Sequence, residues 1–114
     1  VPCVLVTMSW RSLADAVVDA LPEGTFTALV TGDEVEHGKP HPEPYEKAAA
    51  ILGVEPRRTL AIEDSNTGAR SAEAAGCTVL VVPNHVPVLP GNRRIFRPSL
   101  VGMTHSTLPR PIAD

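Results

Sequence analysis

A regular alternation of short apolar runs with helical patterns constrains the fold of this sequence more than any other feature. Apolar runs of strand character occupy residues 4–6, 27–31, 59–62 and 78–82. Between these runs, apolar residues recur at helical spacing, and the second and third helical patterns stop at glycines, Gly53 and Gly76. Strands and helices that alternate at such short spacing predict an α/β chain, with a parallel sheet covered by helices on both faces. Ser9 or Ser12 is expected to cap the first helix.

Size and composition exclude several classes of protein. A chain of 114 residues with 43% apolar and 20% charged residues fits one globular domain. A net charge of −3 without a basic stripe argues against a nucleic-acid partner. No apolar run is long enough to form a membrane-spanning helix, so we do not expect the membrane to be a partner. Cys3 and Cys77 lie in apolar, strand-like contexts without metal-binding spacing. They are therefore expected to be buried free thiols in a reducing cytoplasm.

Polar side chains are found where the predicted strands end. Thr7 follows the first strand, Glu63 and Asp64 follow the third, and Lys39 lies in the loop that leaves the second. The carboxyl ends of parallel strands share one edge of a sheet, where binding sites gather in α/β proteins. We therefore expect a hydroxyl, an ammonium and two carboxylates to converge at this edge.

Each of these groups also has a purely structural interpretation. Glu63 and Asp64 could form a solvated turn, with Asp64 or Ser65 capping the next helix. As a functional pair, the two carboxylates offer the oxygen ligands that Mg²⁺ prefers. Taken alone, Lys39 could be an exposed loop residue and Thr7 a structural hydroxyl at the end of a strand. Together, the ammonium and the hydroxyl would be suited to bind a phosphate group.

The aromatic and histidine residues near these groups are expected to be structural. His37 and His41 flank Lys39 without a matching third ligand, so we interpret them as loop residues and not as a zinc pair. Trp10 and Tyr45 are expected to be packing or rim residues.

Three segments in this order resemble a known family. "VLVTMS" at residues 4–9, "GKPHPEPY" at 38–45 and "AIEDSNTGARSAEAAG" at 61–76 are similar to motifs of the haloacid dehalogenase superfamily of phosphohydrolases. The match is to the C-terminal half of the core domain in the β-phosphoglucomutase and phosphoglycolate-phosphatase-like branch. The resemblance implies a Rossmann-like three-layer α/β/α core over residues 1–86. Residues 87–114 are then a Pro-rich C-terminal segment, with a last edge strand expected near residues 100–103.

The resemblance also implies roles for residues at the strand ends. Thr7 would bind the transferring phosphoryl group, helped by the backbone of Met8 and Ser9. Lys39 would neutralise the charge of the phosphoryl oxygens and of the nucleophile. Mg²⁺ would be held by Asp64, with Glu63 binding it directly or through water.

One departure from the family pattern is large. The family's nucleophile and its general acid–base are the two aspartates of a D-x-D motif at the end of the first strand, and this sequence contains no D-x-D. Asp33, in the loop after the second predicted strand, is not expected to substitute. In the family, the first strand lies in the sheet between the two strands that correspond to residues 4–6 and 59–62 of this chain. The family's cap domain also comes before the segments found here in the order of the chain. We therefore expect an incomplete core and a missing N-terminal part, on the same chain or on a separate one.

The resemblance thus implies part of a cytoplasmic, Mg²⁺-dependent phosphatase that acts on a small phosphorylated metabolite. Hydrolysis would proceed through an aspartyl-phosphate formed on the missing aspartate, so that this chain alone would be inactive. A phosphomutase similar to β-phosphoglucomutase is one alternative. A non-catalytic fragment that serves as a binding module is another.

Overall fold

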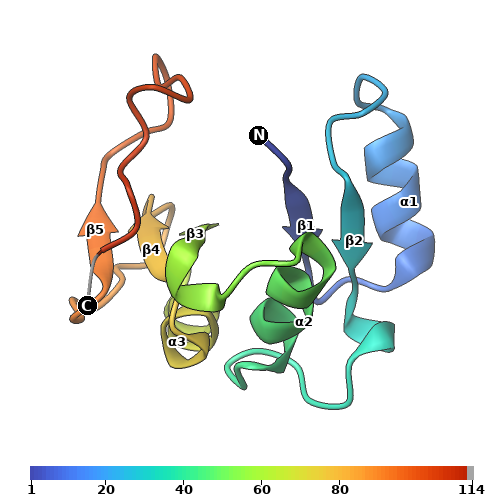
Figure 1. The fold of residues 1–114 in the computed structure, drawn as a ribbon, viewed down its shortest axis with the longest axis horizontal. Helices are drawn as coiled ribbons and strands as arrows, with labels where there is room; N and C mark the ends of the chain where they lie inside the picture. The colour runs from blue at the N-terminus through green and yellow to red at the C-terminus, as the bar shows by residue number, and fades with distance from the viewer. Residues whose placement is uncertain (113–114) are drawn as a thin grey trace.

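Five strands form two separate sheets, each with parallel pairing, in the computed structural model, which describes residues 1–112 (Figure 1). In the first sheet, β1 (Val4–Val6) pairs with β2 (Ala28–Val30). The second sheet has the order β3 (Leu60–Glu63), β4 (Thr78–Val81) and β5 (Arg94–Phe96). The α/β class with parallel strands, predicted from the alternation of apolar runs and helices, is confirmed.

Three α-helices connect and cover these strands. The α-helices are α1 (Arg11–Asp19), α2 (Glu43–Leu52) and α3 (Asn66–Ala75). The loops between the elements also contain two short 3₁₀ helices, η1 (Gly32–Glu34) and η2 (Pro56–Arg58). Helix α2 packs against β1 and β2, and α3 packs against β3 and β4. Because α2 and α3 also contact each other, they form one layer that joins the two sheets. Figure 1 shows α1 beyond β2, at the opposite end of the molecule from β5.

The ends of α2 and α3 follow local sequence signals. Each helix stops at a glycine with a left-handed φ, 71° at Gly53 and 102° at Gly76, which glycine adopts without steric cost. At the start of α3, Ser65 Oγ accepts a hydrogen bond of 3.1 Å from the Gly68 amide. One of the two caps expected for this helix, Ser65, is therefore confirmed.

The expected cap of α1 is wrong. The residue before the helix is Trp10, and no side chain at that position caps the helix. Instead, the Arg11 amide donates a 3.0 Å hydrogen bond to Asp33 Oδ1, from the 3₁₀ turn η1 that follows β2. The helix start is satisfied by a residue distant in sequence because β1 and β2 are neighbours, which brings the segments that follow them together.

The core lies around β4 and α3. All four residues of β4 are buried. A fully buried valine or leucine contributes roughly 1.5–3 kcal/mol to the free energy of unfolding, so β4 is the most strongly stabilised strand. The cluster packed here consists mainly of small side chains: Tyr45, Ala61, Ala69, Ala72, Cys77, Val79, Val81 and Val88.

The sheet is interrupted between β1 and β3, which have no strand pairing with each other. The residues of β1 are all half-buried although each of them is apolar. Apolar side chains elsewhere are exposed as well, with exposed fractions of 58% at Leu13, 51% at Val17 and 45% at Ile62. This arrangement confirms the incomplete core expected from the sequence.

Two further expectations need correction. The last strand is β5, at Arg94–Phe96, while residues 100–103 form a turn in which the Met103 amide bonds to the Leu100 carbonyl at 3.0 Å. Cys77 is buried as expected but Cys3 is exposed, because it precedes β1 at the uncovered edge of the first sheet; both thiols are free.

Residues 113–114 of the expected Pro-rich segment lie outside the described residues. Over the part that the structure describes, no helix has the length and apolarity that crossing a membrane requires.

Candidate functional site

Lys39 connects the carboxyl ends of the two sheets. Its ammonium Nζ donates a 3.1 Å hydrogen bond to the carbonyl of Val6, the last residue of β1. It also forms a 2.6 Å ion pair with Glu63 Oε2, at the end of β3. The Lys39 side chain is only 11% exposed. The structure thus brings Lys39 to the carboxyl ends of β1 and β3, beside Glu63, whereas the convergence expected for Thr7 and Asp64 stays a prediction.

The loop that contains Lys39 is held at both ends. The Lys39 amide donates to the sulfur of Met8 at 3.3 Å, so the side chain of Met8 supports the loop from the β1 side. On the α2 side, the Glu43 carboxylate accepts from the amides of Glu36 at 2.7 Å and His37 at 3.0 Å. These amides, that of Glu36 first, hold the pKa of Glu43 below its ordinary value, so the carboxylate is ionised at neutral pH.

Glu63 is buried and its carboxylate is shared by two donors. Both Lys39 Nζ and the Tyr45 hydroxyl donate to Glu63 Oε2. The carboxylate lies against Gly68 in the first turn of α3, where a Cβ would overlap it. Burial, and next the charge of Glu63, raise the pKa of Tyr45 far above its ordinary value, so its hydroxyl stays protonated and remains a donor. Glu63 therefore positions the ammonium of Lys39.

Asp64 has the opposite environment. It is exposed, and its carboxylate forms neither a hydrogen bond nor an ion pair with any residue in 1–112. Glu63 is the last residue of β3 and contacts Lys39, whereas Asp64 lies just beyond the end of the strand. A free carboxylate suits Mg²⁺, which usually takes one or two carboxylates together with water and substrate oxygens. The metal-binding roles of Asp64 and Glu63 stay predictions.

Thr7 directly follows β1 and is half-buried. Its Oγ1 accepts a 3.1 Å hydrogen bond from the Ser9 amide, and its own amide donates to the Val30 carbonyl at 2.9 Å. Within the described residues, the hydroxyl proton of Thr7 has no acceptor. It can therefore be donated to a bound oxygen, although the Ser9 amide expected to help bind phosphate is already used by Thr7.

Sequence reasoning missed two functional neighbours of Lys39. Tyr45 is not only a packing residue, because it hydrogen-bonds Glu63 and its ring centroid lies 5.2 Å from the Lys39 ammonium. Met8 contributes its side chain, whose sulfur accepts a hydrogen bond from the Lys39 amide, while the phosphate-binding role expected for its backbone stays a prediction. The sequence offered one signal for this role of Tyr45: it follows Lys39 by six residues and lies on the apolar face of the predicted helix, which is the buried face of α2.

The structure also bears on the other acids and histidines. Asp33 accepts hydrogen bonds from the Thr31 hydroxyl and the Arg11 amide, so it has a structural role and not that of a nucleophile. The conclusion that His37 and His41 have no third ligand is wrong, because Glu43 lies beside both of them. Its carboxylate arrives there because α2 begins immediately after the loop.

Comparisons with known proteins agree with this arrangement. A family model described as haloacid dehalogenase-like hydrolase matches residues 1–76. The chain is 39% identical over 84 residues to protein CbbY of Rhodobacter capsulatus, an alignment that covers 70% of this chain and 37% of that protein. It is 42% identical over 52 residues to phosphoglycolate phosphatase of Salmonella typhi, which covers 46% of this chain and 21% of that enzyme.

A solved structure shares the fold. CbbY from Rhodobacter sphaeroides in complex with phosphate matches with a TM-score of 0.73 and 29% sequence identity. The match covers 83% of this chain and 46% of that chain. This chain therefore spans less than half the length of each of these three proteins.

Proposed function

Because this chain belongs to the haloacid dehalogenase-like hydrolases, we propose that it is the lysine-bearing part of a Mg²⁺-dependent phosphatase. The substrate would be a small phosphorylated metabolite. The observation that supports this proposal is the position of Lys39, whose nearly buried ammonium joins the ends of β1 and β3. A fixed positive charge beside a free hydroxyl suits a phosphoryl group.

The proposed reaction has two displacement steps. A carboxylate oxygen of the first D-x-D aspartate attacks phosphorus, the bond from phosphorus to the ester oxygen breaks, and the second aspartate gives its proton to the departing alcohol. Water then attacks phosphorus of the aspartyl-phosphate and gives a proton back to the second aspartate, while the bond from phosphorus to the first aspartate breaks, releasing inorganic phosphate and regenerating the carboxylate. Lys39 would offset the charge on the phosphoryl oxygens and Thr7 would donate its hydroxyl proton to one of them.

The residues of this chain that would hold Mg²⁺ are Asp64 and, directly or through water, Glu63. Glu63 Oε2 is engaged by Lys39 and Tyr45, whereas Oε1 accepts no hydrogen bond from the described residues. When bound, Mg²⁺ would neutralise charge on the phosphate and the nucleophile. Asp64 would be the principal ligand, because its carboxylate is exposed and unpaired within residues 1–112.

The nucleophile would come from a further strand carrying a D-x-D sequence, on the same polypeptide or a separate one. The interruption between β1 and β3 supports this part of the proposal, because a strand placed there would pair with both. Its carboxyl end would then lie beside Lys39. The part of the protein that selects the substrate would also lie outside this chain, and without that part and the nucleophile the chain would be inactive.

The test uses the complete protein with an aryl phosphate as substrate and Mg²⁺ as the metal. Lys39→Ala is expected to lower kcat by about a hundred- to a thousand-fold, the typical cost of removing one preorganised charge donor. Asp64→Asn is expected to lower the rate at a given Mg²⁺ concentration and to raise the Mg²⁺ concentration required for half-maximal rate.

Two exposed residues provide matched controls. Lys47→Ala removes an ammonium from α2, and Asp19→Asn removes a carboxylate from the end of α1; both should leave the rate unchanged. Full activity in both the Lys39 and the Asp64 variants would show that the site is misassigned. With a sugar phosphate as substrate, accumulation of an isomerised sugar phosphate in place of inorganic phosphate would overturn hydrolysis in favour of a mutase.

A further inference from the structure

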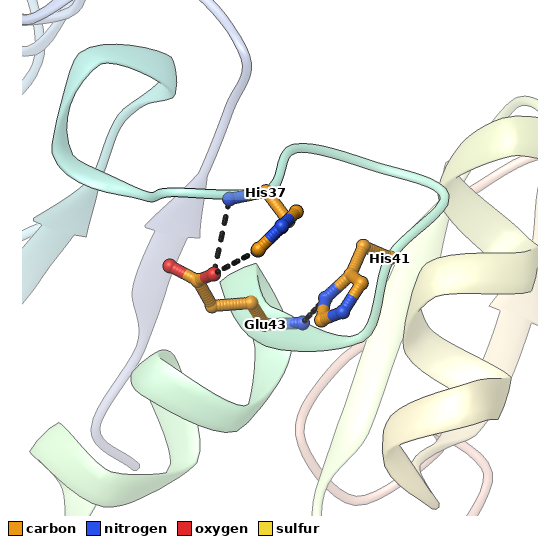
Figure 2. A group of neighbouring side chains, drawn as sticks. All are labelled: His37, His41 and Glu43. Carbon is orange, nitrogen blue, oxygen red and sulfur yellow. Dashed lines mark hydrogen bonds and ion pairs between the residues drawn. The ribbon is translucent and has the colours of Figure 1, made fainter.

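Three metal-ligating side chains that the proposed hydrolase does not use gather on the loop between η1 and α2 (Figure 2). His37 and His41 are exposed loop residues, and Glu43 is the first residue of α2. One ligand atom from each lies within 4.8 Å of the other two. We propose that these residues form a binding site for one divalent transition-metal ion such as Zn²⁺.

The spacing of two of the ligand atoms already suits a metal. His37 Nδ1 and Glu43 Oε1 are 3.3 Å apart. In a tetrahedral zinc site, bond lengths of about 2.0–2.2 Å to nitrogen and oxygen place neighbouring ligand atoms roughly 3.3–3.5 Å apart. A metal ion could thus bind both atoms with little movement of either side chain, in place of their present hydrogen bond.

The surrounding contacts hold the Glu43 carboxylate and the backbone of His41 in place. Glu43 Oε2 accepts from the Glu36 amide at 2.7 Å and Oε1 accepts from the His37 amide at 3.0 Å, which fixes the carboxylate. The carbonyl of His41 accepts a 2.7 Å hydrogen bond from the hydroxyl of Ser71 on α3. The two imidazole rings stack with centroids 4.7 Å apart, so both are on the same side of the loop as the carboxylate. The entropy lost on binding a metal is smaller when its ligands are already ordered.

His41 is the ligand that must move. Its Nδ1 accepts a 3.0 Å hydrogen bond from the Glu43 amide, so Nε2 carries the proton of the neutral ring. A metal at Nδ1 would replace this bond, and a metal at Nε2 would require the other tautomer, which also breaks it. The ring must in addition turn out of its stack with His37, because a metal lies in the plane of an imidazole that binds it. Exposure of His41 permits this turn, and water can then bind the released amide.

The ligand set selects the class of metal. Two imidazoles and one carboxylate suit Zn²⁺, Co²⁺ or Ni²⁺, whereas Mg²⁺ prefers oxygen ligands alone. The site would therefore differ in preference from the one proposed at Asp64. Since Lys39 lies between the two histidines, a bound metal would also tie down the loop that contains it.

The test is a titration of the complete, tag-free protein with Co²⁺ in the presence of saturating Mg²⁺. We expect visible absorption bands of ligand-bound Co²⁺ that saturate at one equivalent and disappear when Zn²⁺ is added. His37→Gln and His41→Gln should each weaken Co²⁺ binding by at least about tenfold, since each removes one of three ligands. Circular dichroism would confirm that both variants are folded.

Matched controls separate this site from others. Replacing two exposed histidines outside the cluster, His85→Gln and His105→Gln, should leave Co²⁺ binding unchanged. Asp64→Asn should also leave it unchanged, so failure of the proposed phosphatase would not affect the result. The proposal is overturned if Co²⁺ binds without saturation, if the His37 and His41 variants bind it normally, or if the Asp64 variant loses it.

Discussion

Burial links the ionisation of Tyr45, the only tyrosine of the chain, to unfolding. Desolvation, and next the Glu63 carboxylate, raise the pKa of Tyr45 above its ordinary value of 10.0. A group whose pKa is higher in the folded state stabilises the fold fully below its unfolded pKa and loses this contribution as the pH rises towards the folded pKa. We therefore expect the free energy of unfolding to fall as the pH rises above about 10, and tyrosinate to appear only as the protein unfolds.

The measurement compares the ultraviolet absorbance of tyrosinate with far-ultraviolet circular dichroism during an alkaline titration. Subtracting the absorbance curve of the Tyr45→Phe variant leaves the contribution of Tyr45 alone, without that of tyrosines elsewhere in a longer protein. Appearance of Tyr45 tyrosinate near pH 10, about the ordinary value for a tyrosine, with an unchanged dichroism spectrum would contradict the prediction. It would mean that the hydroxyl is not buried against Glu63.

At the scale of elements, the start of α3 depends on one side chain. Ser65 Oγ accepts from the Gly68 amide at 3.1 Å, so Ser65→Ala should lower the free energy of unfolding by about 0.5–2 kcal/mol, the usual cost of losing such a cap. Ser12→Ala is the matched control, because Ser12 lies exposed in α1 and caps nothing. Urea unfolding of the three proteins measures both effects. Equal unfolding midpoints for the Ser65 variant and the unmodified protein would show that the hydrogen bond does not stabilise α3.

Local signals in the sequence were enough to predict most elements. The apolar runs predicted β1 to β4 to within about one residue, because a buried parallel strand is continuously apolar. Two features depended on contacts that the sequence does not display. The start of α1 is satisfied by Asp33, more than twenty residues later in the chain. Strand β5 begins with Arg94 and has no continuous apolar run, so only its pairing with β4 defines it as a strand.

The candidate site was predictable to the extent that it depends on strand order. Lys39 and Glu63 could be expected at one edge because parallel strands end there, and the structure places them 2.6 Å apart. Tyr45 belongs to α2 and reaches Glu63 because α2 packs against β1 and β2, and the position of a helix relative to a sheet is a tertiary property that spacing does not give. Glu43 reaches the two histidines by a local route, because α2 begins directly after their loop.

At the scale of the whole molecule, burial is uneven. Strand β4 is paired on both sides and fully buried, whereas β1 and β3 each pair with a single neighbour. Unpaired strand edges leave amides and carbonyls without partners and favour pairing with a further strand. The exposed Ile62 of β3 shows that apolar surface is also left uncovered at one of these edges. Local opening should therefore be easiest in β1 and hardest in β4.

Hydrogen exchange followed by mass spectrometry tests this difference and the proposed further strand together. In the 114-residue chain alone, amides of β4 should exchange most slowly and those of β1 much faster. In a longer protein that supplies a strand between β1 and β3, both of these strands should become about as protected as β4, because each gains a second paired edge. Strand β5 provides the control, since its free edge faces away from the interruption and its exchange should be equal in the two proteins. Equal exchange of β1 in both proteins would mean that no strand pairs there, and the nucleophile of the proposed phosphatase would have to reach Lys39 from elsewhere.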